Sequence, residues 1–554
     1  MPSTHHLVSL CKVLVEDMLG QVGAQIVLTL LQVGRLSAKE LTKATNFPYS
    51  AVKRALVSLV HMRLVLYWED PNQWGPVYYR ADTTNIYHLI WAGQVSAQLK
   101  EQTQKDELGP VLLDFITNGH FSIEGYIKKN PEAREKLEQL LQTGYLVPLH
   151  EFEFWPEEDI KQQSITKHFR EVNKDPTTLS LTDNAKKQMV DAAVKRDLDN
   201  MEATRQAGSK GLVTAASHDQ KLVLAVNYER FLLTERRKEL VQLVDDRIGS
   251  ITAQVYDAVL ECFEHGRSLF QRDKERVPMP GNIVNSSEIL LKLQSRKEPV
   301  KLESAFIAET QNDEVKTEPD AAARGHKRMK SKIGSISVTP AAALTPLELV
   351  NRHLRLLEKA GFAFLRRVGD LHGGEWFVPM SDLLADLRRH TFDEIVSELL
   401  GASAARILRV VREYSKIDEK ALSQTSLLQS NGLRIHTNNL EYFGFIDLQE
   451  VPRSNDRAPG RNIYLWFHRP KWAYSRLVEQ IYGAIAKTYD DIFALRAKHK
   501  TLLAKLTRVD VAGHEDELLT AQEKVELAEY TSQEQQLWVK QEKLDRHVRI
   551  FCYY

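Results

Sequence analysis

The chain has 554 residues, and its 74 lysines and arginines are balanced by 74 aspartates and glutamates. A chain with zero net charge does not coat nucleic acid by overall charge, so any nucleic-acid contact must come from local basic patches. Its three cysteines, Cys11, Cys262 and Cys552, lie far apart and show neither zinc spacing nor a disulfide framework, which is typical of a reducing compartment.

The sequence also excludes several classes of function. No uninterrupted apolar run reaches the ~18 residues that span a membrane, and the N-terminus lacks the basic and apolar regions of a secretion signal. The phosphate-binding, dinucleotide-binding, zinc-protease and hydrolase motifs are all missing. We therefore expect no catalytic residue, no metal and no cofactor, and no contact with a membrane.

One arrangement recurs four times: short helices around a polar turn, followed by a strand, a turn and a second strand. In the first copy, Ser37 and Glu40 form the capping box of a short helix. Pro48 then breaks the chain, and Ser50 is expected to cap a third helix. Strands over residues 64–68 and 77–80, with turn residues between them, complete a winged helix.

The third helix of this first module carries the first candidate contacts. Tyr49, Lys53 and Arg54 lie near its exposed start, where a helix-turn-helix presents side chains to DNA. A Lys-Arg pair on a short helix is also typical of an ordinary solvated face, so both interpretations stay open.

The second module is expected to carry an insertion in its wing. A helix over residues 108–116 and a second from Ser122 precede a third, which Pro131 opens and Gly144 ends. Residues 156–220 are polar and lack a strand pattern, so they predict an insertion between two strands. Within that insertion, residues 182–205 favour a charged surface helix. The two strands that flank it are expected at residues 145–149 and 222–226.

The third module is predicted to start with one helix over residues 231–260 and to be split by a disordered insertion, about residues 296–340. The basic end of that insertion fits a nuclear localisation signal or a nucleic-acid tail, and a solvated linker is the alternative. Its candidate residues are Lys327, Arg328, Lys330 and Lys332. A helix that starts at residue 345 or 346 and ends at Gly361 supplies two more contact candidates, Arg352 and Arg355.

The fourth module has expected helices over residues 405–411, 418–422 and 432–442, and strands over 443–449 and 463–468. The loop between the strands carries Arg453, Arg457 and Arg461. Because the planar fork of arginine suits phosphate, these three residues are candidates for contact with nucleic acid or with an acidic partner.

The last segment, from Trp472 onward, differs from the modules. Two adjacent apolar seams run along its first helix, and they predict that a second helix, at about residues 516–548, packs against it. The favoured interpretation is an internal stalk, and an intermolecular zipper is the alternative. The fold class is therefore mainly α with small β wings: four tandem winged-helix domains around a C-terminal antiparallel coiled-coil hairpin. The expected domains are residues 5–95, 106–230, 231–392 and 393–470, with the leucine-zipper-like hairpin at 471–554.

This order of parts resembles the third-largest subunit of nuclear RNA polymerase III, a family related in module type to the alpha subunit of transcription factor IIE. The resemblance rests on residues 7–67, 225–231, 250–259 and above all 443–466, a strand, an Arg/Pro-rich wing and an aromatic return strand. It implies a non-catalytic nuclear subunit that forms a heterotrimer with two other specific subunits on the clamp of the largest subunit, and that is not a homo-oligomer.

The resemblance further implies a role in promoter opening and initiation at genes for transfer RNA and 5S ribosomal RNA, through contacts with DNA and initiation factor IIIB. One alternative is a free-standing winged-helix DNA-binding regulator that dimerises through its coiled coil. A second is a scaffold like those of the proteasome or signalosome, against which four modules argue. A stand-alone DNA binder needs a basic recognition helix, because phosphate neutralisation supplies most of its affinity. The mixed charges of these modules therefore favour the polymerase subunit.

Overall fold

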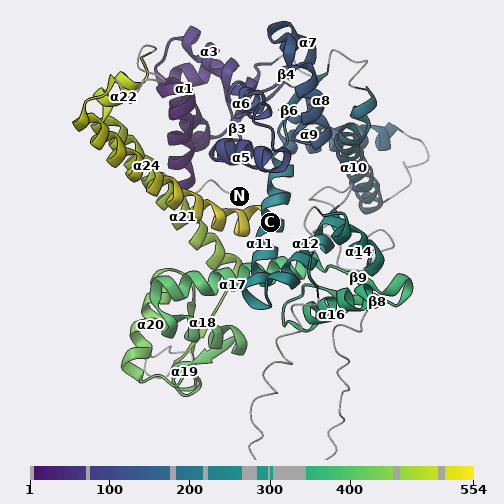
Figure 1. Ribbon diagram of the computed structural model, residues 1–554. Coiled ribbons are helices and arrows are strands. Elements are labelled where there is room, and N and C mark those ends of the chain that lie inside the picture. The colour runs from purple at the N-terminus through teal and green to yellow at the C-terminus, as the bar shows by residue number, and fades with distance from the viewer. Residues whose placement is uncertain are drawn as a thin grey trace, which may run out of the picture. The chain divides into compact units, whose positions relative to one another are not determined.

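The computed structural model describes residues 5–69, 75–174, 182–215, 222–264, 283–296, 300–302, 345–452, 462–508 and 518–554. The chain divides into two compact units, which are described separately. The first unit contains Met1–Phe231 and Val396–Tyr553, and the second contains Leu232–Ile395 with Tyr554. Figure 1 shows the elements, which are mostly helical.

Four three-stranded antiparallel sheets are present among the described residues, and they share one topology. In each sheet the last strand in the chain lies in the middle, and it pairs with both the first strand and the second. The sheets are β1 (Leu36–Ser37), β3 (Tyr78–Ala81), β2 (Val65–Trp68); β4 (Phe121–Ser122), β6 (Val223–Val226), β5 (Leu146–Pro148); β7 (Ile283–Asn285), β9 (Glu375–Phe377), β8 (Arg366–Gly369); and β10 (Lys416–Asp418), β12 (Ile463–Phe467), β11 (Asp447–Val451).

The first module begins with α1 (His5–Val33), which is long and apolar enough to cross a membrane by length and composition alone. Helical spacing over this region was expected, but a helix with this length and hydropathy was not, because charged residues interrupt its apolar run. In the structure α1 packs against α3 and α21, and its apolar side chains Leu10, Leu14 and Ile26 are buried. Helix α1 therefore belongs to the hydrophobic core of the first unit.

The capping box at Ser37 and Glu40 is confirmed: the Ser37 backbone N–H and hydroxyl donate to the Glu40 carboxylate, which holds the pKa of that carboxyl below its usual value. Ser50 was wrongly predicted to cap the third helix. The helix begins at Tyr49, and Pro48, with φ −59° and ψ 140°, occupies the N-cap position, two residues before Ser50. The helices of this region are α2 (Ala38–Thr45), α3 (Tyr49–His61), α4 (Thr83–Tyr87), η1 (His88–Trp91) and α5 (Ala92–Thr103).

The second module follows the predicted order, and Gly144 ends its third helix in the left-handed conformation with φ 79°. Gly119, with φ 92°, lies directly against the end of α3: a Cβ there would be 2.2 Å from the His61 carbonyl oxygen. Only glycine allows this close approach between the two modules. The helices are α6 (Leu108–Asn118), α7 (Ile123–Lys129), η2 (Pro131–Ala133), α8 (Arg134–Thr143) and η3 (Glu151–Phe154).

The insertion between β5 and β6 contains two long helices that pack on each other, α9 (Glu157–Lys174) and α10 (Asp183–Ala215). The prediction of a charged helix over 182–205 is confirmed for α10, but α9 was missed, because its pattern is polar almost throughout. Ion pairs join this region to the first module: Arg35 to Asp159, Arg63 to Glu153 at 3.0 Å, and Arg80 to Glu158 at 2.7 Å.

The second unit contains most of the third module. The single helix predicted over residues 231–260 is wrong, because Gly249, with φ 126°, separates two helices. The predicted disorder of residues 296–340 falls almost wholly outside the described residues. Further elements are α11 (Tyr228–Arg247), α12 (Ser250–Glu264), α14 (Ser286–Gln294), α16 (Pro346–Lys359), η5 (Leu371–Gly373) and α17 (Met380–Leu400), of which α11 and α17 cross the boundary between the units.

The fourth module lies in the first unit, and Asp418 caps its second helix by accepting a hydrogen bond from the Ala421 N–H. Its first strand was predicted too early, because residues 443–446 still belong to the turn after the third helix and Gly444 there has φ 75°. The helices are α18 (Ala402–Tyr414), α19 (Glu419–Ser426) and α20 (Ser430–Tyr442).

In the C-terminal segment, α21 (Pro470–Lys498) and α22 (Lys500–Leu506) are followed by α24 (Ala521–Val548) and η7 (Arg549–Tyr553). Helices α21 and α24 pack side by side and run antiparallel (Figure 1), since Tyr489 contacts Trp538 while Arg496 contacts Glu534. The predicted seam, which runs along α21 and continues on α22, is largely buried. It comprises Val478, Ile481, Ile485, Ile492 and Leu502 as buried members, with Leu495 and Leu506 partly exposed.

The sequence pattern predicts that this seam is matched on the second helix by Leu518, Leu519, Val525, Leu527, Leu537, Val539 and Leu544, and this prediction is wrong at three positions. Leu518, Val525 and Val539 are exposed, because α24 faces α21 through aromatic and polar side chains. Of the remaining predicted residues, only Leu519 is buried, and Leu527, Leu537 and Leu544 are half-buried.

A buried charged cluster anchors the end of α24. Asp545 is fully buried, accepts a hydrogen bond from the Tyr87 hydroxyl at 2.7 Å and another from Trp91 Nε1 at 3.0 Å, and pairs with Arg549 at 3.3 Å. Burial raises the pKa of the Asp545 carboxyl, while Arg549 and these hydrogen bonds oppose that shift. This cluster ties the C-terminal segment to the first module.

Candidate nucleic-acid interface

The exposed face of α3 is the best-defined candidate interface. Val52, Leu56 and Leu59 are buried and fix the orientation of the helix, so its opposite face is left toward solvent. Tyr49, Lys53 and Arg54 all lie on that face, as predicted from the sequence. The structure therefore brings these three candidates together over the first two turns.

The two cations of this face are held by contacts that leave their charge unneutralised. Lys53 Nζ lies 5.3 Å from the centre of the Tyr49 ring, and Arg54 Nε donates to the Ser50 carbonyl oxygen at 3.4 Å. Neither side chain pairs with a carboxylate among the described residues. Free guanidinium and ammonium groups beside an exposed tyrosine can bind phosphate and stack on a base.

Arg352 and Arg355 lie on α16 in the second unit, so they form a separate candidate. Arg355 is exposed and Arg352 is half-buried. Hydrogen bonds from Thr345 hold the pKa of the Glu348 carboxyl below its usual value, and Arg352 lowers it further. Arg352 is thus partly neutralised by its own helix, which weakens it as a phosphate ligand.

The wing arginines Arg453, Arg457 and Arg461 lie outside the described residues, and so does the basic cluster of Lys327, Arg328, Lys330 and Lys332. The paired strands β11 and β12 place the ends of the loop that carries the wing arginines, at Val451 and Ile463.

One cluster was missed by the sequence analysis. Trp472 is 46% exposed at the start of α21, and the guanidinium carbons of Arg469 and Arg476 lie 5.5 and 5.0 Å from its ring centre. Arg469 also donates to Asp447 at 2.8 Å, which raises its pKa, whereas Arg476 has no carboxylate partner among the described residues. The spacing of these residues, i, i+3 and i+7, could have indicated one helix face.

The third helix of the fourth module presents a different surface. On α20, Ile435 is 61% exposed and Tyr442 is 87% exposed, and Leu427 just before the helix is 84% exposed. Its one arginine, Arg434, donates from Nε to Glu419 at 2.6 Å. This face combines large apolar side chains with uncharged polar ones such as Asn438 and Asn439, and Glu441 is its other exposed charged residue.

A cluster on the insertion helices resembles catalytic residues only in composition. Ser164 donates to Asp197 at 2.7 Å, and the His168 imidazole donates to the same carboxylate at 2.7 Å and to Glu171 at 2.9 Å. The serine thus contacts the carboxylate and not the imidazole, so it has no base to activate it. The part of the chain that the structure describes holds no group of three or more His, Cys, Asp or Glu that could bind a metal.

Comparison with known proteins assigns the chain to a family. The family model for RNA polymerase III subunit RPC82 matches residues 135–387, and the model for its helix-turn-helix domain matches residues 9–70. A third model, the POLR3C C-terminal winged-helix domain, matches residues 392–468. Two of the four modules are therefore matched by helix-turn-helix or winged-helix models of one subunit.

Curated relatives extend this similarity over nearly the whole chain. DNA-directed RNA polymerase III subunit RPC3 of Yarrowia lipolytica is 29% identical over 99% of this chain and 98% of its own length. The subunits of the same name from Debaryomyces hansenii and Saccharomyces cerevisiae are 28% and 26% identical, over 92% and 93% of this chain and 91% and 88% of their own lengths.

These matches cover the α3 face, the insertion helices and the fourth module in one alignment, and they do not support the alternative of a free-standing DNA-binding regulator that dimerises through its coiled coil. The chain belongs to the family of the third-largest subunit of RNA polymerase III and is a non-catalytic subunit of that polymerase.

Proposed function

We propose that this subunit acts in promoter opening and initiation at the genes for transfer RNA and 5S ribosomal RNA, and that it guides DNA with the exposed face of α3. The observation that carries the proposal is the pair of cations Lys53 and Arg54, which no carboxylate among the described residues neutralises, beside the exposed Tyr49 on the third helix of a matched helix-turn-helix domain. Phosphate contacts position a protein on the duplex, and such a face supplies them.

The finer architecture belongs to the same proposal. Four winged helices in tandem surround a C-terminal antiparallel coiled-coil hairpin, with domains at residues 5–95, 106–230, 231–392, 393–470 and 471–554. The shared strand order of the four sheets and the antiparallel packing of α21 on α24 support this division.

The proposed surroundings follow from the family. The subunit works in the nucleus, in a heterotrimer with two other specific subunits on the clamp of the largest subunit, and contacts initiation factor IIIB. It is not a homo-oligomer.

A photo-crosslinking residue at position 53 of the assembled polymerase tests the DNA contact. In an initiation complex on a transfer RNA gene, we expect it to crosslink promoter DNA. The same residue placed at position 435, on the neutral face of α20, is the matched control. A crosslink from position 435 alone, or from neither position, would reject the contact.

The wing of the fourth module is proposed as a second contact. Replacing Arg453, Arg457 and Arg461 by alanine should weaken DNA crosslinking of the assembled polymerase without changing the folding of the chain. Unchanged crosslinking and unchanged transcription would reject this role.

The basic cluster in the third module is proposed to support nuclear import. Deleting residues 324–332 should reduce nuclear accumulation of the fluorescently labelled chain. Full accumulation would show that the polymerase is imported without this cluster.

A further inference from the structure

An open groove of about 670 Å³ lies between α21 and α24 within the first unit. Four residues of each helix line it, at spacings of i, i+3, i+4 and i+7, which means that each helix turns one stripe toward the gap. The lining residues are Asp491, Ala494, Leu495 and Lys498 on α21, and Gln533, Gln536, Leu537 and Lys540 on α24.

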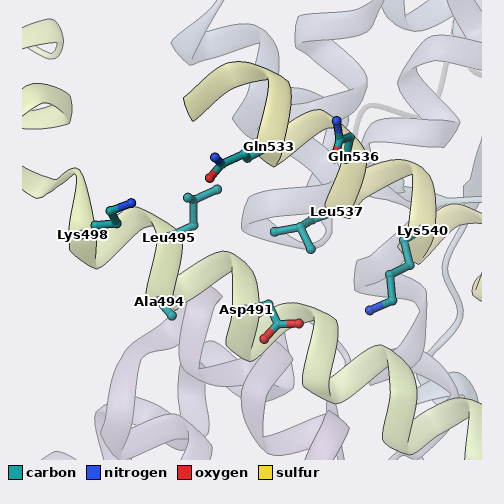
Figure 2. Close-up of a pocket in the computed structure, with 8 residues that line it drawn as sticks. All are labelled: Asp491, Ala494, Leu495, Lys498, Gln533, Gln536, Leu537 and Lys540. Atoms are coloured by element: carbon teal, nitrogen blue, oxygen red, sulfur yellow. The ribbon is translucent and has the colours of Figure 1, made fainter. Parts of the chain in front are cut away.

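The floor of this groove is apolar and its rim is polar. Figure 2 shows the side chains of Leu495 and Leu537 pointing into the gap from opposite helices, with the glutamines and lysines around them. Neither leucine is fully buried, although Leu495 belongs to the seam that packs the rest of α21. Beside the groove, the two helices contact each other through the Arg496–Glu534 ion pair at 3.1 Å and through the aromatic contact of Tyr489 with Trp538.

The charges on the rim are not neutralised by the described part of the chain. The side chains of Lys498, Lys540 and Asp491 make no hydrogen bond or ion pair with any described residue. Because the helices are antiparallel, Asp491 and Lys540 share one end of the groove, while Lys498 lies beside Gln533 at the other (Figure 2). Among the lining residues, the charges of Asp491 and Lys540 therefore cancel at one end of the groove, while the Lys498 end carries a positive charge.

Two neighbouring helices with facing stripes at this spacing have the geometry of a helical bundle that lacks one member. An amphipathic helix laid along the groove would place apolar side chains over the two leucines at i and i+3 or i+4. A second copy of this chain fits less well: a two-fold contact places the same surface of both copies together, so it would set a groove against a groove and not a helix into one. An acidic residue on the incoming helix would instead neutralise the positive end.

We propose that the groove between α21 and α24 binds an amphipathic α-helix of another subunit of the polymerase, which inserts two apolar side chains against Leu495 and Leu537 and sets a carboxylate beside Lys498. The proposal rests on the place of the chain in a subcomplex, and it names the surface and the chemistry of one partner there.

A photo-crosslinking residue at position 494, in the floor of the groove, tests the proposal in the purified, assembled polymerase. The crosslinked peptide is identified by mass spectrometry. We expect a segment of another subunit with apolar residues at helical spacing and an acidic residue at one end. A crosslink to a second copy of this chain, a crosslink only within the chain, or no crosslink would each overturn the proposal.

Matched variants separate binding from folding. Leu495→Asp should lower the yield of that crosslink about tenfold or more, because it puts a charge on the apolar floor. Val539→Asp makes the same kind of change on α24 at an exposed position outside the groove, and it should leave the yield unchanged. Equal losses from both variants would contradict the proposal.

Lys498→Glu is a milder change at an exposed position, so it keeps the test valid if Leu495→Asp fails to fold. It should reduce the crosslink several-fold, and replacing the partner's carboxylate by lysine should restore it. No loss, or a loss that the charge swap does not restore, would refute the predicted carboxylate. If these tests fail while position 53 still crosslinks DNA, the groove proposal alone is wrong.

Discussion

Helices α3 and α20 occupy the same place in two modules. Each has 13 residues, follows a short helix and precedes a strand hairpin, and neither has a side-chain cap. Their exposed faces differ: α3 presents Lys53 and Arg54 without carboxylate partners among the described residues, whereas the arginine of α20 is paired and the rest of its exposed face is mainly apolar or uncharged. The shared winged-helix scaffold determines the position of this helix in the module, and the residues on its exposed face determine which kind of partner it can bind.

The largest expected effect is a loss of stability from a change in the buried Asp545 cluster. It shows how large a folding defect can be, so that the effects of variants on α3 and α20 can be compared with it. Asp545→Ala should lower the free energy of unfolding by roughly 3–5 kcal/mol, because it removes the buried carboxylate that pairs with Arg549 and accepts hydrogen bonds from Tyr87 and Trp91. Chemical denaturation of the purified chain measures this. Asp490→Ala, at an exposed position of α21, should stay within about 0.5 kcal/mol. A small effect of Asp545→Ala would mean that the cluster does not hold the C-terminal segment.

Charge reversal on α3 should break the proposed DNA contact. The double variant Lys53→Glu, Arg54→Glu should weaken DNA binding by the assembled polymerase roughly tenfold or more at low salt, and it should reduce the salt dependence of log K by about 1.8, or 0.9 per phosphate contact. Titration with labelled promoter DNA at several salt concentrations measures both. Arg434→Glu on α20 should do much less, and an equal loss would show that the two helices do not differ as stated.

A change at the exposed Ile435 of α20 tests whether this helix, unlike α3, makes no contact with DNA. Ile435→Asp should leave DNA binding unchanged and alter the free energy of unfolding by less than about 0.5 kcal/mol, because the side chain is exposed. The DNA titration and thermal denaturation check this. A loss of DNA binding as large as that of the α3 variant would assign the contact to α20.

The smallest expected effect concerns the insertion helices, which are ion-paired to the module that carries α3. The hydrogen bonds to Asp197 and Glu171 raise the pKa of the His168 imidazole above its ordinary value of 6.5. A group with a raised folded-state pKa stabilises the fold fully below its unfolded value, and this contribution is lost as pH rises through the folded value. Hydrogen exchange in α9 and α10, corrected for intrinsic rates, should therefore become faster with rising pH, while α20 should not change.

The His168→Gln variant is the control for this pH dependence. Its glutamine keeps a hydrogen-bonding side chain but cannot take up a proton, so the change with pH should disappear from both insertion helices. If the wild-type exchange does not change between about pH 6 and about pH 8, the proposed charge on His168 is wrong.

Local chemistry made much of the fold predictable. The capping box at Ser37 and Glu40 and the helix-ending Gly144 each depend on a few neighbouring residues, and both are confirmed. The α3 candidates were found for the same reason, since the spacing of buried residues along one helix shows which side chains are left outside. Helix α9 was missed because its buried positions are few, and one of the two, Ser164, is polar.

The sequence by itself determined the type and order of most elements, because capping, turn residues and apolar spacing act over only a few positions. Tertiary structure decided which charges are free. Arg434 and Lys53 look alike in the sequence, but a glutamate 15 residues away pairs with one and no described carboxylate pairs with the other. It also decided that α24 meets α21 through Trp538 and Glu534 instead of the predicted leucines, because side-chain partners across a helix pair depend on the rotation of each helix, which no local pattern specifies.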